Sequence, residues 1–592
     1  MKRALIFNLL FFIFLYTSGQ KKIVHKILSW EEPKSISHYY TPEQKGFNKT
    51  DYLSFEGAEY LNQESMLPYF YDLIPVLSEN ISVKIVNIKY INATAKEISI
   101  LNQIKEIDTD IQVKHKVSFM RGKPYVQINF LPLIKNAFTG QIEKVKSFDI
   151  EITPVQKSLS SLAGKEKAFV SQSFLKSGYW IKIQIAETGI YQISYNQIRE
   201  LGFEDPTNIK IFGNSEGMLP VSNTEECQDD LNQLAIHFEK GADGIFNEGD
   251  YILFYAKSPH QWGYDADKDF YSLKKHLYSD YNYYFLTTDA GNNKIIQTIP
   301  PPTETAIAVK TNFTDYFHHE NDLKNLIESG QLWLGEYFDA TTSYSFNFEI
   351  PNREISTPVK SKIELAARSS VNSTFTLRVN GTSFANPEIP FVNMSSYTST
   401  YAYSGISENT FNSSIGNVNI QIDYNKPTSS SVGWLNYITL NAVRKIHMYE
   451  DQLIFRYYNP TTSNEIIEFV IENTTGNTRF WDITDAIEIN ELQSTTISSN
   501  TKRLKVNAAP GINEYLAFNN TGFLTTNQSE PVANQNLHGI NHRDMIIITH
   551  TDFLSQAEKI ATIHQEQDNL NCAVVTVDEI YNEFSSGTPD VS

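Results

Sequence analysis

The sequence predicts a mainly β protein, in which several β-sandwich or jelly-roll-like domains are followed by the start of a parallel α/β domain. Aromatic residues make up 13% of the 592 residues, with 33 Tyr and 36 Phe, and such side chains favour half-buried pleated surfaces. Short segments that alternate apolar and polar residues recur along most of the chain, separated by Asn, Ser, Thr and Gly clusters. Only the C-terminal stretch differs, because strand-like and helix-like segments alternate there.

The N-terminus has the features of a secretory signal peptide over residues 1–19. Two basic residues precede a short apolar segment, and small residues at Thr17 and Gly19 place the expected cut between Gly19 and Gln20. The apolar segment is shorter than the ~20 residues of a membrane-spanning helix, and no later stretch approaches that length. We therefore expect an exported protein without a transmembrane helix after signal removal, with an uncleaved anchor as the alternative.

Residues 20–154 are expected to form an N-terminal β-domain. Segments 125–130 and 148–152 alternate apolar and polar side chains with the period of two that is typical of strands. The stretch 155–172 is rich in Ser and Lys and predicts a linker.

Residues 173–300 are expected to form a second β-rich domain. It begins with an alternating strand at 179–185, continues through a short helix at 195–201 that Gly202 ends, and includes a strand at 251–255. Adjacent prolines predict its C-terminal boundary, because proline cannot donate a ladder hydrogen bond.

Residues 301–540 predict a β-sandwich or jelly-roll-like region. Many short alternating strands, such as 345–350 and 375–379, are separated by polar turn clusters. Aromatic residues continue throughout, so the polar clusters indicate loops and not disorder.

Residues 541–592 predict the incomplete start of an α/β domain. The apolar runs 545–549 and 572–575 are typical of strands buried on both faces of a parallel sheet. Two strands do not make such a sheet, so Ser592 is interpreted as a truncation point. We expect this part to be the least stable, and its removal to leave the melting of the remainder unchanged.

Helices are expected after both strands. Thr551 or Asp552 is the expected cap of the first, and Thr576 with Glu579 resembles a capping box that opens the second. The first helix is expected to bury one face, which is formed by Phe553, Ala557, Ile560, Ala561 and His564.

Charge and cysteine content exclude some classes of protein. The formal net charge of −19 argues against a nucleic-acid partner, which needs concentrated Lys and Arg. Only Cys227 and Cys572 occur, so the chain is not a disulfide-stapled scaffold. Two free thiols are expected, with a bridge between them as the alternative.

Neither cysteine is placed for nucleophilic catalysis, which needs a nearby histidine and an environment that favours the thiolate. Cys227 lies in the acidic stretch 225–230, which disfavours the thiolate. Cys572 is at the amino end of its strand, whereas His550 follows the carboxyl end of the other. If the strands are parallel, these side chains are ~15 to 20 Å apart and form no dyad. His550 is near the rim where open α/β sheets gather active sites, although a rim residue without a role is the simpler interpretation.

A structural Ca²⁺ site is one interpretation of the loop 241–250. Asp243, Asn247 and Asp250 supply hard oxygen ligands among glycines, but the ligand order and the terminal Glu of an EF-hand are missing. A tight acidic turn between two strands is the favoured alternative. No other cofactor is expected.

The paired histidines do not predict a metal site. His318 and His319 are adjacent in an extended segment, so their side chains point to opposite faces. His538 and His542 are four residues apart, but Gly539 weakens a helix there and no third ligand is near in sequence. Both of these residues are expected in a loop.

Several phrases resemble the gingipain-type (C25) cysteine peptidase family, and in particular its sortase branch in the type IX secretion system. The resemblance spans roughly residues 175 to 592, and none of its phrases is a catalytic motif. The phrases are 187–191, 249–255, 333–338, 433–437, 548–554 and 573–587.

The resemblance implies a gingipain- or caspase-like α/β domain at 541–592 and a cell-surface cysteine endopeptidase. Such a sortase removes C-terminal signal domains from secreted cargo, transfers cargo to a surface glycolipid, and is tethered by an outer-membrane protein after transit through the periplasm. The family's catalytic His and Cys have no match here and are expected beyond Ser592, so the chain as given is predicted to be inactive. The alternative is a non-enzymatic secreted β-protein, an adhesin or assembly scaffold.

Overall fold

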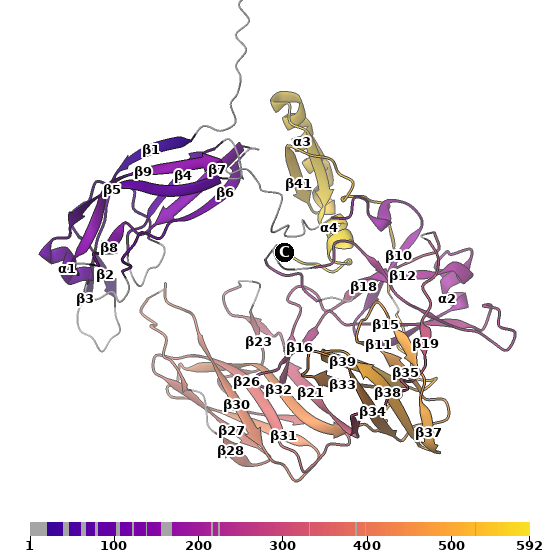
Figure 1. Ribbon diagram of the computed structural model, residues 1–592. Coiled ribbons are helices and arrows are strands. Elements are labelled where there is room, and N and C mark those ends of the chain that lie inside the picture. The colour runs from indigo at the N-terminus through magenta and orange to yellow at the C-terminus, as the bar shows by residue number, and fades with distance from the viewer. Residues whose placement is uncertain are drawn as a thin grey trace, which may run out of the picture. The chain divides into compact units, whose positions relative to one another are not determined.

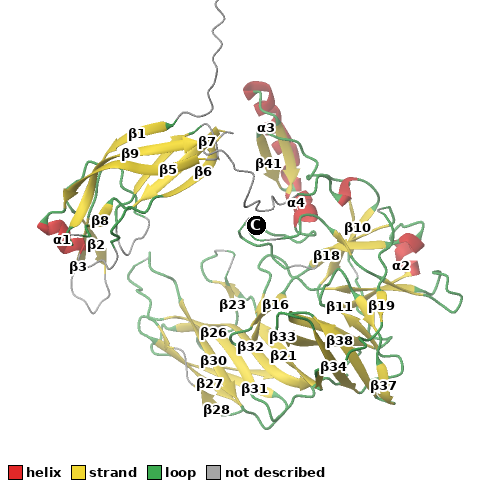
Figure 2. Cartoon of the chain, viewed as in Figure 1, coloured by secondary structure: helices red, strands yellow, loops and turns green. Residues whose placement is uncertain are grey.

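The fold comes from a computed structural model. It describes residues 21–591 except 40–46, 61–66, 77–80, 102–106, 121–122, 138, 155–168, 215–216, 223–224, 226, 290, 329, 331, 385–387, 397 and 527. The signal peptide and its expected cut between Gly19 and Gln20 lie outside the described residues. Strands dominate the regular structure, as Figure 2 shows, which confirms the mainly β prediction. The chain divides into two compact units, Met1–Glu166 and Lys167–Ser592.

The first unit is a β-sandwich. One sheet has the order β1-β9-β5 with β8 beside β9, and the other has the order β4-β7-β6. Phe70 of the second sheet contacts Phe148 of the first, with ring centroids 5.0 Å apart, so both sheets share one apolar core. The elements are β1 (Lys22–Ile27), β2 (Lys34–Tyr39), β3 (Phe47–Tyr52), β4 (Phe70–Pro75), β5 (Ile81–Asn92), α1 (Ala95–Leu101), β6 (Lys114–Met120), β7 (Lys123–Phe130), β8 (Leu133–Lys135) and β9 (Ile142–Pro154).

The second unit opens with a small sandwich. Its sheets have the orders β13-β12-β18-β10-β40 and β11-β15-β14, and Ile183 of the first shares a core with Phe254 of the second. Ser194 and Gln197 form the capping box that starts helix α2. The elements are β10 (Trp180–Ile185), β11 (Gly189–Ser194), α2 (Tyr195–Glu200), β12 (Lys210–Gly213), β13 (Asn232–Gln233), β14 (His237–Glu239), β15 (Tyr251–Ala256), β18 (Asn282–Thr287) and β40 (Ser529–Val532).

A second sandwich of this unit covers residues 312–445. Sheet β21-β32-β26-β30, with β24 beside β32, packs on sheet β25-β31-β27-β28, with β29 beside β27. The elements are β21 (Asn312–Glu320), β24 (Tyr337–Phe338), β25 (Ser343–Phe348), β26 (Val359–Arg368), β27 (Ser373–Val379), β28 (Thr382–Phe384), β29 (Glu388–Ile389), β30 (Tyr403–Phe411), β31 (Val418–Asn425) and β32 (Val432–Lys445). Two hairpins flank it, β16 (Gln261–Asp265) with β17 (Phe270–Lys274) and β22 (Lys324–Asn325) with β23 (Trp333–Leu334).

A third sandwich lies beside the second (Figure 1). Sheet β19-β36-β35-β39-β33 packs on sheet β20-β34-β38-β37. The elements are β19 (Gln297–Ile299), β20 (Ala308–Lys310), β33 (Gln452–Asn459), β34 (Glu465–Glu472), β35 (Arg479–Asp482), β36 (Asn490–Leu492), β37 (Thr495–Ser498), β38 (Thr501–Ala508) and β39 (Gly511–Phe518).

The three sandwiches interlock, which differs from the expected division at residue 300. Val532 of β40 pairs with Trp180 of β10, so a late strand completes the sheet of the first sandwich. Ile190 and Leu253 of the first sandwich share a further core with Trp481 of the third. Residues 173–300 and 301–540 therefore belong to one compact unit.

The C-terminal segment is a strand-helix-strand-helix unit. Its elements are β41 (Met545–Thr549), α3 (Leu554–Asp568), β42 (Cys572–Thr576) and α4 (Val577–Phe584), and α3 packs on the two strands (Figure 1). One face of β41 is open, with Ile546 58% exposed and Ile548 60% exposed, as expected for two apolar strands without the neighbours that would bury both faces. A sheet with a helix layer on one face leaves the other face in solvent.

Helix α3 also differs from its expected form. A 3₁₀ turn at Thr551–Phe553 precedes it, with His550 as the capping residue. Ala557 and Ala561 are buried, but Phe553 and Ile560 are exposed. The buried face of α3 is therefore narrower than the spacing of its apolar residues in the sequence predicted. The predicted capping box of Thr576 with Glu579 is present at α4.

Candidate functional site

The two strands of the C-terminal segment are parallel, with Met545 opposite Cys572 and Thr549 opposite Thr576. Cys572 is therefore at one end of the strand pair and His550 lies past the other end, about 15 Å away at ~3.3 Å per residue. The Cys572 thiol is buried and donates to the Leu570 carbonyl at 3.7 Å. The two side chains form no dyad, as the sequence predicted.

Neither cysteine takes part in a disulfide. Cys227 is half-buried in the loop before β13, and the neighbouring Asp229 and Asp230 contact a different part of the chain.

We call the group formed by His538, Glu583, Asp229 and Asp230 the anchor cluster. The Glu583 carboxylate is fully buried and accepts four hydrogen bonds, which fills its acceptor sites. The donors are Leu537 N at 2.7 Å, Gln535 Nε2 at 3.0 Å, His538 N at 3.1 Å and His538 Nδ1 at 2.6 Å.

The second nitrogen of His538 contacts the loop before β13. Nε2 lies 3.0 Å from the carbonyl oxygen of Asp229 and 3.4 Å from its carboxylate, and the ring stacks on Phe584. Both nitrogens thus face acceptors, an arrangement that the doubly protonated imidazolium satisfies completely. The cluster ties α4 to the first sandwich through a residue that the sequence placed in a loop without a role.

The charges around His538 set its protonation. Burial by itself disfavours the imidazolium, but the hydrogen bond to Glu583 and the carboxylates of Asp230, Glu583 and Asp229 outweigh it and raise the pKa of His538 above its usual value. Burial also raises the pKa of Asp230, although the backbone N–H groups of Leu231 and Phe174 oppose that shift.

The residues after α4 extend this contact along β18. Ser586 Oγ donates to the Tyr283 carbonyl at 3.1 Å, and Thr588 Oγ1 donates to Asn282 Oδ1 at 3.0 Å. Asp590 accepts from the backbone of Leu219 at 2.9 Å. The part from α4 to Asp590 is thus packed against the first sandwich, which argues against the expectation that removal of 541–592 leaves the melting of the remainder unchanged.

The residues of the expected calcium loop bond to one another and to backbone. Both Asp250 oxygens accept N–H groups, from Gly241 and Asn247 at 2.9 Å each. The Asn247 amide donates to Asp243 at 2.9 Å. Among the described residues, no group of three or more acidic, His or Cys side chains is arranged to hold a metal. Calcium at this loop stays a prediction.

The adjacent histidines of β21 diverge, as expected. His318 Nε2 lies 2.9 Å from Glu320, whereas His319 Nε2 lies 2.9 Å from Glu336. Each imidazole therefore has its own carboxylate partner.

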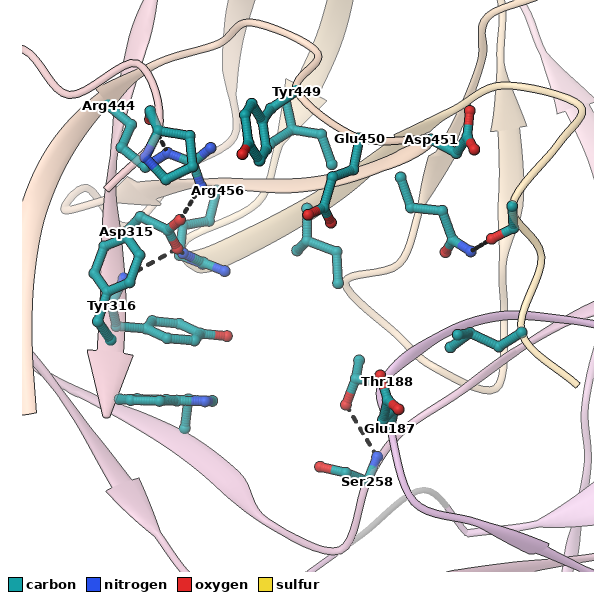
Figure 3. Close-up of a pocket in the computed structure, with 18 of the residues that line it drawn as sticks. Glu187, Thr188, Ser258, Asp315, Tyr316, Arg444, Tyr449, Glu450, Asp451 and Arg456 are labelled. Carbon is teal, nitrogen blue, oxygen red and sulfur yellow. Dashed lines mark hydrogen bonds and ion pairs between the residues drawn. The ribbon is translucent and has the colours of Figure 1, made fainter. Parts of the chain in front are cut away.

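A cavity with a volume of about 790 Å³ lies where the three sandwiches meet. We call it the central groove. Figure 3 shows the 449–451 turn on one wall and Glu187 with Thr188 on the opposite wall. Its floor carries Asp315, which Arg444 and Arg456 contact at 2.6 and 2.8 Å. The sequence had not indicated this groove, because its walls come from distant segments.

An aromatic stack borders the same floor. The rings of Trp262 and Tyr316 lie face to face with centroids 3.6 Å apart, and the Arg456 guanidinium covers Tyr316 at 4.1 Å. Burial raises the pKa of the Tyr316 phenol, so it stays protonated.

Within the described part of the chain, none of the helices combines the length and apolarity needed to cross a bilayer.

Comparison with known proteins supports a family relation. The profile of Peptidase family C25 matches residues 540–592. A search of curated protein sequences found no match. The structure of dimeric latent PorU from Porphyromonas gingivalis is similar in fold, with a TM-score of 0.63 and 23% identity, over 71% of this chain and 39% of that chain.

A complex of the pro- and mature domains of RgpB from the same organism also matches. It is 13% identical and covers 26% of this chain and 89% of that chain, but its TM-score of 0.17 carries no structural argument. The chain spans well under half of the PorU chain that it matches. The chain therefore has a fold similar to that of PorU over 71% of its length, and its residues 540–592 match peptidase family C25.

Proposed function

We propose that the chain is the N-terminal, β-rich part of a type IX secretion system sortase. The complete protein is a cell-surface cysteine endopeptidase that cleaves C-terminal signal domains from secreted cargo and transfers the cargo to a surface glycolipid. The observation that carries the proposal is a C25 segment at 540–592 joined to a β-rich unit with the fold of PorU.

In this proposal the catalytic residues are supplied by sequence beyond Ser592. A thiolate attacks the scissile carbonyl, a histidine transfers the protons, and backbone N–H groups stabilise the oxyanion. Neither cysteine is the nucleophile. Cys572 and His550 lie at opposite ends of the strand pair, and Cys227 lies in an acidic loop. The 592-residue chain is accordingly inactive.

The β-rich unit positions the peptidase domain and its partners. The anchor cluster supports this role, because it attaches α4 to the first sandwich through a fully buried carboxylate. The partners are cargo proteins with C-terminal signal domains and an outer-membrane tethering protein. The protein reaches the cell surface through the periplasm after removal of residues 1–19.

The test is a protein extended through the complete α/β domain and assayed on cargo with and without its signal domain. We expect cleavage that thiol-alkylating reagents abolish, and C227S and C572S variants that remain active. A folded C572S variant that no longer cleaves would contradict the placement of the nucleophile. A folded, exported extended protein without cleavage would instead favour the adhesin or scaffold function.

A further inference from the structure

The central groove separates two sheet edges. β21 is the edge strand of the second sandwich and β33 is the edge strand of the third, and both line the cavity. They approach each other at one end, where Arg456 Nη1 donates to the Thr314 carbonyl at 3.3 Å. An edge strand offers unpaired N–H and C=O groups that an extended peptide can use to add a strand.

The groove also carries carboxylates that have no ion-pair partner among the described residues. Glu187, Glu349, Glu450 and Asp451 line it, and none of them is in an ion pair with another described residue. The two arginines of the floor do not compensate, because Asp315 binds both of them and Glu514 lies 3.5 Å from Arg456. The free charge of the groove is therefore negative on both walls.

Aromatic surface adds a preference for organic cations. Tyr449 is 58% exposed at the rim beside Glu450, and the Trp262–Tyr316 stack lies below. Carboxylates next to aromatic rings suit lysine and arginine side chains, which combine a charged head with an apolar stem.

We propose that the central groove is a docking site for an extended, positively charged peptide segment. The backbone of the peptide pairs with the edge of β33, because the Thr314 carbonyl and the Tyr316 N–H of β21 already bond to Arg456 and Asp315. Its lysine or arginine side chains contact Glu187 on one wall and Glu450 and Asp451 on the other. This binding is independent of peptidase chemistry, so it goes beyond the proposed function and is testable on the 592-residue chain.

The probe is a capped, fluorophore-labelled six-residue peptide that alternates lysine with threonine, titrated with the protein at low ionic strength and followed by anisotropy. We expect saturable binding that weakens with salt, because exposed ion pairs are screened. The triple variant E187Q/E450Q/D451N should bind about tenfold more weakly, since each exposed pair contributes roughly twofold. Within the described residues these carboxylates form no ion pair, and the Asn side chain of D451N still offers an oxygen to the Thr521 hydroxyl, so the variant should keep its fold, which its melting curve checks.

The matched control is E200Q/E558Q/E566Q, which changes the net charge equally at exposed sites outside the groove. It should bind like the unaltered protein, and an equal loss in this control would reduce the effect to the overall charge of −19. A glutamate-threonine peptide should not bind. An alternately N-methylated lysine peptide should bind several-fold more weakly, and equal binding would overturn the strand pairing. A neutral trisaccharide that binds where the lysine peptide does not would make the groove a saccharide site and overturn the proposal.

Discussion

Replacing Glu583 by Gln tests whether the anchor cluster holds α4 on the β-rich unit. The carboxylate is fully buried and accepts four hydrogen bonds, two of them from His538. Glutamine has nearly the same shape but carries one NH₂ group, so one side of the new carboxamide faces N–H donors instead of accepting from them. The change also leaves the imidazolium of His538 without its closest counter-ion.

The expected cost is about 3 kcal/mol. Removing one partner of a buried ion pair costs roughly 3–5 kcal/mol, and the lower end applies here because Asp229 and Asp230 remain near His538. We expect this cost in the local opening of α4, which lies at the edge of the unit, before it appears in global unfolding. A change of ~3 kcal/mol corresponds to a roughly hundredfold faster amide exchange.

Hydrogen exchange with mass spectrometry measures this directly on peptides that cover α4 and residues 535–540. D578N is the matched control, because Asp578 is an exposed carboxylate in the same helix. The change keeps an oxygen that can accept from the Thr551 hydroxyl and removes a helix-dipole interaction of up to ~1 kcal/mol, so exchange should rise by no more than about fivefold. If E583Q exchanged no faster than D578N, the buried cluster would not be what attaches α4.

Four further outcomes follow from the same contacts. The pKa of His538 is raised, so its stabilising contribution is present below ~6.5 and is lost as the pH rises through the raised pKa. Amide exchange in α4, corrected for intrinsic rates, should therefore accelerate as the pH rises above ~6.5, and H538Q should remove this pH dependence. G587A should lower the free energy of unfolding by about 2 kcal/mol, because Gly587 has φ +81° and an added Cβ would lie 3.0 Å from Tyr283. G291A is the control: its φ is also positive but the added Cβ would meet open space, so it should lower the free energy of unfolding by about half as much. Deletion of 541–592 should lower the melting temperature of the remainder, because it leaves His538 without Glu583. An unchanged melting temperature would show that this segment does not stabilise the rest of the unit. EDTA should leave the melting temperature unchanged, because both Asp250 oxygens already accept backbone N–H groups, and a fall of several degrees would reveal a bound cation.

Local patterns in the sequence were sufficient for the class of fold and for several elements. Alternation of apolar and polar residues is a property of consecutive positions, so it predicted the mainly β architecture and strands such as β10 without knowledge of their partners. Capping is equally local, which is why Thr576 and Glu579 marked the start of α4 correctly. The parallel strands of the C-terminal segment also followed from their short apolar runs.

Only the tertiary structure decided which distant segments meet. The pairing of β10 with β40 joins residues 180 and 532, and no local pattern encodes it. His538 lies in a loop, as predicted, but its contacts could not be predicted because its partners, Asp229 and Glu583, are 309 and 45 positions away. The central groove has the same origin, since β21 and β33 become neighbours only when two sandwiches pack. Periodicity reports which side of an element is apolar, but burial and charge pairing depend on what the fold places opposite that side.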